Sequence, residues 1–192
     1  MLTCGKLLGT VHHILKKIKI TEIFSSIQGE SSHAGKRCVF VRLTGCNLRC
    51  GYCDTAYAFH GGESFTIEEI VTKVVDYGVP LVEITGGEPL MQKNCPDLAK
   101  ALLDAGLQVM IETNGSYNVN VLPDEVIKIV DVKAPSSGEG DSFIMDILTQ
   151  IDAKDELKFV IGSREDYLWA KAFVEEHILI DTTTDCWITP PA

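Results

Sequence analysis

Three cysteines within eight residues carry the clearest chemical signal in the chain. Cys46 and Cys50 are separated by three residues, and Cys50 and Cys53 by two. Thiolates are the protein ligands of iron–sulfur clusters, and this spacing places three of them on one short loop. Because a four-iron cluster has four irons to ligate, three thiolates leave one iron open. The loop therefore predicts a cluster at which chemistry can occur, rather than one that only stores electrons.

Zinc and disulfide chemistry are weaker interpretations of the same cysteines. A structural zinc site usually has four protein ligands, commonly supplied as two separated pairs. Cys38 could be a fourth thiol, but it begins the apolar run 38–41 and is expected to be a buried strand residue. Disulfides are disfavoured because the cysteine count of seven is odd and no secretory leader is recognisable. An iron–sulfur site is favoured, with zinc or structural thiols as the alternatives.

The elements that must position this loop alternate between strand and helix patterns. Strands are expected at 19–24, 38–43, 81–85, 107–112, 127–132 and 157–161, and either 178–180 or 187–188 is expected to end the sheet. A capping box at Thr66–Glu69 should begin a helix that Gly78 ends, with 67, 70, 71, 74 and 75 on its apolar face. Further helices are expected over 97–105 and from Ser163 to about 176.

This alternation predicts an α/β fold with a mostly parallel sheet and outer helices. The chain has 192 residues, whereas eight complete β/α units need about 250. We therefore expect an incomplete TIM-type barrel. Functional side chains of such barrels gather at the C-terminal ends of the strands, and four candidates follow this rule: Arg42, Thr85, Glu112 and Lys133.

Composition limits the classes of partner. The size suits one domain, which we place at residues 17–192 after an N-terminal extension of residues 1–16. A formal net charge of −10 disfavours nucleic acid as a partner, because phosphate binding requires a basic face. The sequence contains no run of 18 apolar residues, so no membrane span is expected. Free cysteines favour the reducing cytoplasm.

Two segments together resemble the radical S-adenosylmethionine (SAM) superfamily. The cysteine loop carries an aromatic residue, Tyr52, just before its last cysteine, and the glycine-rich stretch Ile84–Pro89 follows an apolar strand. A Gly-Gly pair alone is more often an ordinary turn, but glycines also let a backbone approach a ligand closely. The resemblance implies a radical SAM fold in which SAM binds the open iron. The SAM contacts that it implies are Tyr52, Cys53, Asp54, Gly86, Gly87, Glu88, Lys133, Ser136 and Ser137.

A narrower resemblance is to the 7-carboxy-7-deazaguanine synthases. It rests on residues 24–30, on 40–50, and on Cys53-Asp54-Thr55 with 57–59 behind it, and it extends from about residue 19 to 161. Such enzymes convert 6-carboxy-5,6,7,8-tetrahydropterin to 7-carboxy-7-deazaguanine with loss of ammonia, in queuosine and 7-deazapurine biosynthesis. The resemblance implies a [4Fe–4S] cluster held by Cys46, Cys50 and Cys53, SAM used as a regenerated cofactor, and Mg²⁺ bound by Thr55.

The same resemblance implies a set of substrate contacts. Arg42 follows an apolar strand and could bind a carboxylate through two nitrogens, with a surface ion pair as the alternative. Glu30 and Glu112 offer acceptors for the amino and ring N–H groups of a pterin. Thr55, without the motif around it, would be interpreted as a turn or cap residue. The implied contacts are Ile27, Gln28, Gly29, Glu30, Arg42, Thr85 and Glu112.

Other functions stay open at this point. A glycyl-radical-enzyme activase of the same superfamily would have to admit a protein loop, and a non-catalytic metal-binding protein would need only the cysteines. The resemblance implies a small-molecule pterin substrate, an electron donor such as flavodoxin or ferredoxin, and a homodimer. Residues 181–192 depart from the family pattern, and Thr189 or the terminal carboxylate is the candidate for the polar group expected there.

Overall fold

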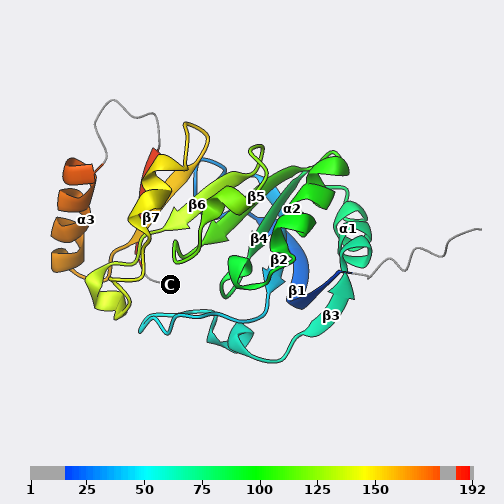
Figure 1. Cartoon of the computed structure of the whole chain (residues 1–192), viewed down its shortest axis with the longest axis horizontal. Helices are drawn as coiled ribbons and strands as arrows, with labels where there is room; N and C mark the ends of the chain where they lie inside the picture. Colours follow the sequence, from blue (N-terminus) through cyan, green and yellow to red (C-terminus); the bar gives the residue numbers. More distant parts are fainter. Residues whose placement is uncertain (1–15, 178–184, 191–192) are drawn as a thin grey trace, which may run out of the picture.

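One mixed sheet organises residues 16–177 and 185–190, the part of the chain that the computed structural model describes (Figure 1). Its strands follow the spatial order β3-β1-β2-β4-β5-β6-β7-β8. The expected extension, apart from Lys16, and the alternative last strand at 178–180 lie outside the described residues. The strands are β1 Lys17–Ile27, β2 Arg37–Leu43, β3 Glu63–Thr66, β4 Leu81–Thr85, β5 Gln108–Thr113, β6 Ile127–Asp131, β7 Glu156–Val160 and β8 Asp185–Thr189.

Most neighbouring strands in this sheet are parallel. The pairs from β2 through β4, β5, β6 and β7 to β8 all run in the same direction, whereas β1 is antiparallel to both β2 and β3. The strands at the two ends, β3 and β8, do not pair with each other in the described part of the chain. The sheet is therefore an unclosed, partial barrel, which confirms the fold class expected from the sequence.

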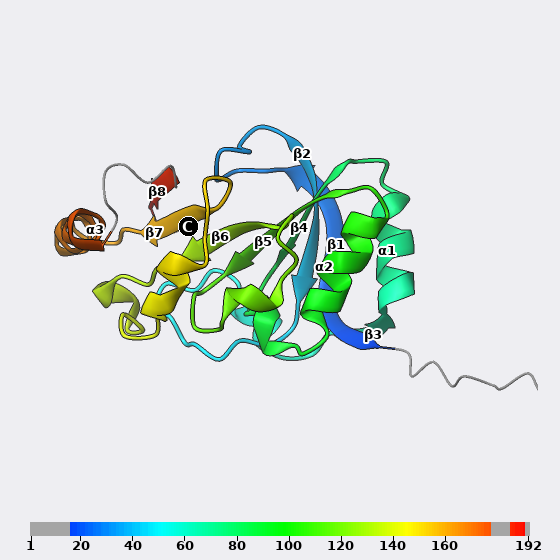
Figure 2. The ribbon, with the colours of Figure 1, turned by 45° about the horizontal axis from the view of Figure 1, so that its top comes forward.

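Within the described residues, three α-helices pack against the sheet: α1 Ile67–Val75, α2 Cys95–Asp104 and α3 Arg164–His177. In Figures 1 and 2, α1 and α2 lie beside β1 and β4, and α3 lies at the far end near β7. The capping box is confirmed, because the Thr66 side chain accepts the Glu69 N–H and the Glu69 carboxylate accepts the Thr66 N–H. Short 3₁₀ helices connect the other elements: Ala56–Phe59, Pro89–Met91, Val119–Val121, Pro135–Ser137 and Met145–Thr149.

Two details of the sequence prediction were wrong. Val75 was placed on the apolar face of α1, but 46% of it is exposed. Val75 is the last residue of the helix and directly follows the buried Val74. Because each residue of an α-helix is rotated by about 100° from the one before it, the Val75 side chain points away from the core. Strand β3 was not predicted, because four residues at a sheet edge, with half-exposed side chains, leave no apolar alternation in the sequence.

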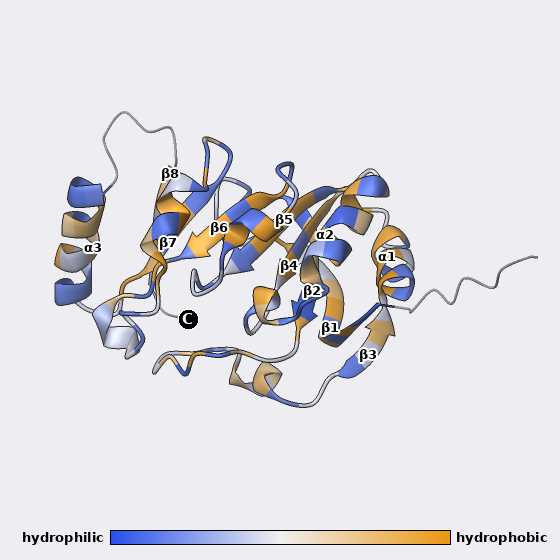
Figure 3. Ribbon diagram, viewed as in Figure 1, coloured by the Kyte–Doolittle hydropathy of each residue, from blue (hydrophilic) through white to orange (hydrophobic). Residues whose placement is uncertain are grey.

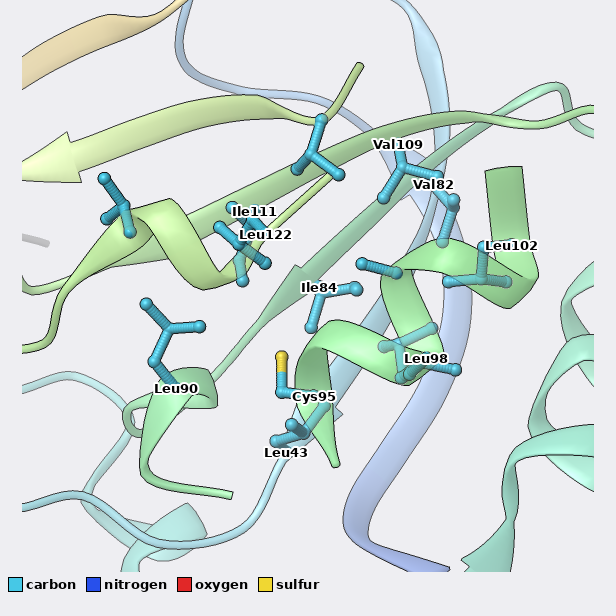
Figure 4. Packing of buried hydrophobic residues seen from close by; sticks show 14 of the residues in the cluster. Leu43, Val82, Ile84, Leu90, Cys95, Leu98, Leu102, Val109, Ile111 and Leu122 are labelled. Atoms are coloured by element: carbon cyan, nitrogen blue, oxygen red, sulfur yellow. The ribbon is translucent and has the colours of Figure 1, made fainter. Parts of the chain in front are cut away.

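The hydrophobic core lies between the sheet and the helices. Val82 and Ile84 of β4 and Val109 and Ile111 of β5 point into it, where Leu98 and Leu102 of α2 meet them (Figure 4). Colouring by hydropathy shows the strands as the most apolar part of the ribbon (Figure 3). Successive side chains in a strand alternate between its faces. The residues between these core positions therefore face the other side of the sheet.

No helix in the described ranges 16–177 and 185–190 is long and apolar enough to cross a bilayer.

Candidate active site

A cavity of about 440 Å³ opens on the sheet face opposite α1 and α2. Alternation places Glu83 and Thr85 of β4 on this face, because Val82 and Ile84 point to the core. The cavity starts at the cysteine loop and continues along the sheet, beyond the strand ends, to the turn that follows β1. Among the predicted site residues its wall includes Ile27, Gln28, Gly29, Glu30, Arg42, Cys46, Cys50, Tyr52, Cys53, Asp54, Thr55, Thr85, Gly86, Gly87, Glu112 and Lys133.

The three cysteines share one end of this cavity. Cys46, Cys50 and Cys53 are half-buried and form no disulfide. Burial raises the pKa of the Cys46 and Cys50 thiols, and Lys133 opposes this shift. A metal centre must therefore displace protons from these thiols when it binds. Cys38, the possible fourth zinc ligand, is fully buried in β2, where burial raises its pKa to about 12.

Backbone hydrogen bonds hold the cysteine loop to three other segments. Gly45 N–H donates to the Ala58 carbonyl at 2.8 Å, and Glu88 N–H donates to the Gly45 carbonyl at 2.8 Å. Further along, Gly51 N–H donates to the Ser137 carbonyl at 2.9 Å. The loop follows β2, but its position is fixed by the segments that follow β4 and β6. The cysteines are thus held by elements far away in the sequence.

The glycine-rich segment after β4 reaches the cavity through its glycines only. Gly86 and Gly87 lie on the wall with φ angles of 77° and 43°. Glu88 does not line the cavity: its side chain is fully buried and accepts hydrogen bonds from Leu90 N–H, Thr113 Oγ1 and Asn114 N–H at 2.9, 2.9 and 2.7 Å. The structure therefore places Glu88 as the link between β4 and β5.

In the segment after β6, too, only some of the predicted residues line the cavity. Lys133 lines the cavity and pairs with Asp131 at 2.6 Å, whereas Ser136 and Ser137 do not line it. Ser136 Oγ donates to the buried Asp166 carboxylate at 2.5 Å, which connects this turn to the start of α3. Ser137 supports the cysteine loop through its carbonyl.

A network of charged and amide side chains lines the opposite end of the cavity. Gln28 Nε2 donates to the Glu83 carboxylate, and Gln28 Oε1 accepts Glu30 N–H at 3.1 Å. Lys158 Nζ bridges Glu30 Oε2 at 2.5 Å and Glu112 Oε1 at 2.7 Å. These residues come from the turn after β1 and from β4, β5 and β7. Four segments of the chain therefore converge on one polar surface.

Burial and Lys158 give the carboxyls of this network different pKa values. Glu83 is 3% exposed, and burial together with the nearby Glu112 raises its pKa to about 8. Burial also opposes ionisation of Glu112, but attraction and hydrogen bonding to Lys158 outweigh it and lower the pKa of Glu112 to about 2. The pKa of Lys158 is raised, since its carboxylate neighbours outweigh burial. At neutral pH the site thus holds a neutral Glu83 beside an ionised Glu112.

Arg42 and Thr55 occupy the region between the two ends. Arg42 Nε pairs with Glu22 Oε1 at 2.8 Å, so the ion pair considered as an alternative is present. Arg42 also lies on the cavity wall, and its bond to Glu22 uses Nε only, which leaves both terminal nitrogens for a ligand in the described part of the structure. Thr55 Oγ1 donates to Asp54 Oδ1 at 2.5 Å, and both residues line the cavity.

Sequence reasoning missed several residues of the cavity wall. Glu83 and Lys158 are single charges inside otherwise apolar strands, a pattern that could have signalled them. Asn114 and Asp131 follow or end strands in the same way as the predicted residues. Pro190 was also missed, whereas Thr189, which the sequence analysis named as a candidate polar group, lines the cavity as well. The terminal carboxylate lies outside the described residues.

Comparison with known proteins identifies the family. The Radical SAM superfamily model matches residues 40–133. The 7-carboxy-7-deazaguanine synthase of Koribacter versatilis is 46% identical over 90% of this chain and 77% of its own length. The synthase of Chlorobaculum tepidum is 44% identical over 83% of this chain and 74% of its own length. The chain belongs to the 7-carboxy-7-deazaguanine synthase family.

A solved structure supports the fold of this synthase family member. The crystal structure of QueE from Escherichia coli superposes with a TM-score of 0.76 at 23% identity, over 91% of this chain and 84% of that one. Membership of the radical SAM superfamily makes a [4Fe–4S] cluster and SAM the cofactors of this enzyme.

The residues present fit both cofactors. No three His, Cys, Asp or Glu side chains in residues 16–177 and 185–190 converge as they would around a single metal ion. A cluster does not need this convergence, because its thiolates bind different irons, and the three thiols are within electrostatic reach of one another. For SAM, Asp131 Oδ1 is a buried acceptor of the cavity wall without a partner in the described structure. A Cβ on Gly86 would overlap Arg42, so glycine keeps this backbone accessible.

Proposed function

We propose that the chain converts 6-carboxy-5,6,7,8-tetrahydropterin to 7-carboxy-7-deazaguanine in the 440 Å³ cavity. Cysteine thiols line the same continuous space as the charged and amide side chains of the network, and this observation carries the proposal. Curated relatives that are 46% and 44% identical over the aligned residues are named for this product. The cavity volume also lies within the usual range for small-molecule sites.

The cysteine end is proposed to hold the cofactors. Cys46, Cys50 and Cys53 would bind the cluster as thiolates. When bound, the cluster and SAM would supply the radical chemistry that removes a hydrogen atom from the substrate. Tyr52, Asp54 and the two wall glycines line the same cavity as the cysteines and would contact SAM, and Lys133 would neutralise charge beside Cys50.

Glu88 and Ser137 are proposed to act on the cofactors through the backbone, whereas Ser136 would act through Asp166, which its N–H and hydroxyl both contact. The Glu88 N–H and the Ser137 carbonyl both hold the cysteine loop, and neither side chain lines the cavity. Their role would be to fix the position of the cysteine loop relative to the glycines that are proposed to bind SAM. This differs from direct side-chain contact with SAM.

The network end is proposed to bind the pterin. The terminal nitrogens of Arg42 would take the substrate carboxylate through two hydrogen bonds. Glu112 is an ionised acceptor for a ring N–H, and Gln28 and Glu30 extend the acceptor surface at the turn after β1. Ile27 and Gly29 complete that side of the wall, and Thr85 fixes Glu112 by a 3.1 Å hydrogen bond.

Thr55 is proposed to bind Mg²⁺ through its hydroxyl. A single protein oxygen is sufficient, because Mg²⁺ retains water and takes oxygens from a bound substrate. Asp54, which accepts the Thr55 hydroxyl, would hold it in place. We also propose that a flavodoxin or ferredoxin supplies the electron and that two copies form a homodimer.

Anaerobic reconstitution tests the function. Protein loaded with iron and sulfide should convert the carboxytetrahydropterin to the deazapurine chromophore when SAM, Mg²⁺ and a reductant are present. Cys50→Ala should hold less iron and lose turnover, because one cluster ligand is missing. Cys95→Ala is the matched control, since Cys95 is the buried first residue of α2 and does not line the cavity.

Two results would contradict the proposal. An intact cluster and normal SAM cleavage without deazapurine would restrict the assignment to the superfamily. Binding of one zinc without acid-labile sulfide would remove the catalytic interpretation altogether.

A further inference from the structure

Lys158 is a buried cation to which none of the sequence motifs assigns a role. It lies in the middle of β7 and is 8% exposed. Its Nζ atom touches two carboxylates of the cavity, Glu30 at 2.5 Å and Glu112 at 2.7 Å. Removing a charge from water costs free energy that a simple apolar side chain would avoid. A buried lysine in a cavity wall therefore needs a reason beyond folding.

The three groups alternate as acceptor, donor and acceptor. Each carboxylate is acceptor-only when ionised, and an ammonium has three N–H donors. Two donors of Lys158 go to Glu30 and Glu112, and no acceptor in the described structure takes the third. Glu30 is engaged through Oε2 only, so its other oxygen is free as well. All three groups line the cavity, so the third N–H and the spare lone pairs are available to a ligand.

Reduced pterins present the complementary order along their edges. In the tetrahydro form, two N–H groups flank an acceptor, either the ring carbonyl oxygen or an unprotonated ring nitrogen. We propose that Glu30, Lys158 and Glu112 form an acceptor–donor–acceptor triad that reads such an edge, and that Lys158 determines its specificity. This inference rests on the proposed function and assigns a ligand contact to Lys158.

The triad also predicts a pH effect, because Lys158 is the cation at the centre of a group of carboxyls. Glu30, Glu112 and Asp131 attract it, Glu83 lies beside Glu112, and Glu156 precedes it on the same strand face. Lys133 is the other cation that acts on Glu112. Without Lys158, Glu112 should ionise only at higher pH. Ligand binding that requires ionised Glu112 should then begin at higher pH.

Equilibrium binding to the holoenzyme tests the triad. Cluster-loaded protein with SAM and Mg²⁺, but without reductant, is titrated with 6-carboxytetrahydropterin, so that binding is measured without turnover. Lys158→Met should weaken binding about 10–100-fold, the usual worth of a charge-assisted hydrogen bond, and move the acid limb of binding to higher pH. Lys158→Arg keeps a cationic donor and should recover part of the loss. Lys154→Met is the matched control, because Lys154 pairs with Asp152 outside the cavity.

A ligand comparison on the unsubstituted enzyme keeps the inference testable if Lys158→Met fails to fold. Fully oxidised 6-carboxypterin has lost the hydrogens on ring nitrogens 5 and 8, so each edge loses one donor. The triad predicts at least tenfold weaker binding of this ligand.

Separate outcomes overturn separate claims. Equal affinity for the two pterins, or unchanged affinity and pH dependence in a folded Lys158→Met that still binds SAM, would overturn the triad and leave the proposed function standing. Failure of the unsubstituted holoenzyme to bind the reduced pterin would overturn the proposed function and the triad with it.

Discussion

At the scale of single residues, the site depends on charged side chains placed inside apolar strands. Glu83 and Glu112 lie on neighbouring strands of the sheet, yet they differ in protonation. The difference arises because Lys158 forms a hydrogen bond with Glu112 and not with Glu83. Glu83 instead meets the amide of Gln28, a weaker partner for a charge. One lysine thus separates a neutral acid from an ionised one.

Glu83→Gln should change how stability depends on pH. The folded pKa of Glu83, about 8, lies above its ordinary value of 4.5, so the native state keeps a proton that the unfolded state has lost. The contribution of Glu83 to the free energy of unfolding of the wild-type protein should therefore fall as pH rises from about 4.5 to 8. Glutamine does not titrate, so the variant should gain stability relative to wild type, on the order of 2–4 kcal/mol, between pH 5 and pH 8. Anaerobic urea unfolding at both pH values measures the difference, and a constant difference would contradict the neutral Glu83.

Arg42→Ala should mainly raise KM for the carboxylated substrate. Loss of a bidentate charge-assisted contact should cost about 10–100-fold in KM with a smaller change in kcat. Since Arg42 also pairs with Glu22, Glu22→Gln is the control: it breaks the ion pair but keeps the guanidinium. Steady-state kinetics of both variants separate the roles. Equal defects in the two would assign the effect to the ion pair.

At the scale of elements, the site requires the segment after β4 to approach the loop after β2. Gly87 lies against Gly45, and the neighbouring Glu88 N–H donates to the Gly45 carbonyl. A Cβ on Gly87 would overlap the Gly45 carbonyl oxygen. This backbone contact connects the glycine-rich segment to the cysteine loop, and no side chain takes part in it.

Gly87→Ala should therefore damage the cysteine loop. The obstacle is backbone, so the two segments must separate, and iron content and SAM binding should fall together. Gly106→Ala is the matched control: Gly106 also has a positive φ, of 83°, but its Cβ would meet nothing within 4 Å. The control should cost about 1 kcal/mol of stability from backbone strain and leave the cluster intact. Iron and sulfide analysis with calorimetric SAM titration compares them, and equal iron content in both variants would refute this role.

Local patterns in the sequence were sufficient for most elements. The capping box, the run 81–85 and the alternation of strands with helices predicted α1, β4 and the open parallel sheet. Those signals involve neighbouring residues only. Lys158 could not be placed, because its partners lie 128 and 46 residues away and only register across the sheet brings them together. The orientation of Glu88 could not be predicted for a related reason: the motif gives its place in the chain, but only the backbone geometry turns its side chain into the core.

At the scale of the whole molecule, the cavity lies among loops that are attached to the sheet only where their strands end. The loops after β2, β4 and β6 contact one another through a few backbone hydrogen bonds. A cofactor that touches all three loops must favour the folded chain over the unfolded one. Stabilisation by ligand follows from its concentration relative to its Kd.

SAM should therefore raise the melting temperature of the cluster-loaded protein. At a hundredfold excess over Kd the gain should be about 2.7 kcal/mol. Cys50→Ala should show a much smaller shift, because the open iron that binds SAM is lost with the cluster. Anaerobic scanning calorimetry with and without SAM measures both proteins. A full shift in the variant would show that SAM binds independently of the cluster.

The alternation along β4 has a consequence for how new specificities could arise. Val82 and Ile84 belong to the hydrophobic core, whereas Glu83 and Thr85, on the opposite face of the same strand, line the cavity. Mutations at odd and even positions therefore act on different properties, recognition on one side and folding on the other. Evolution or protein engineering can therefore substitute residues on the cavity face one at a time while the core residues of the same strand stay unchanged.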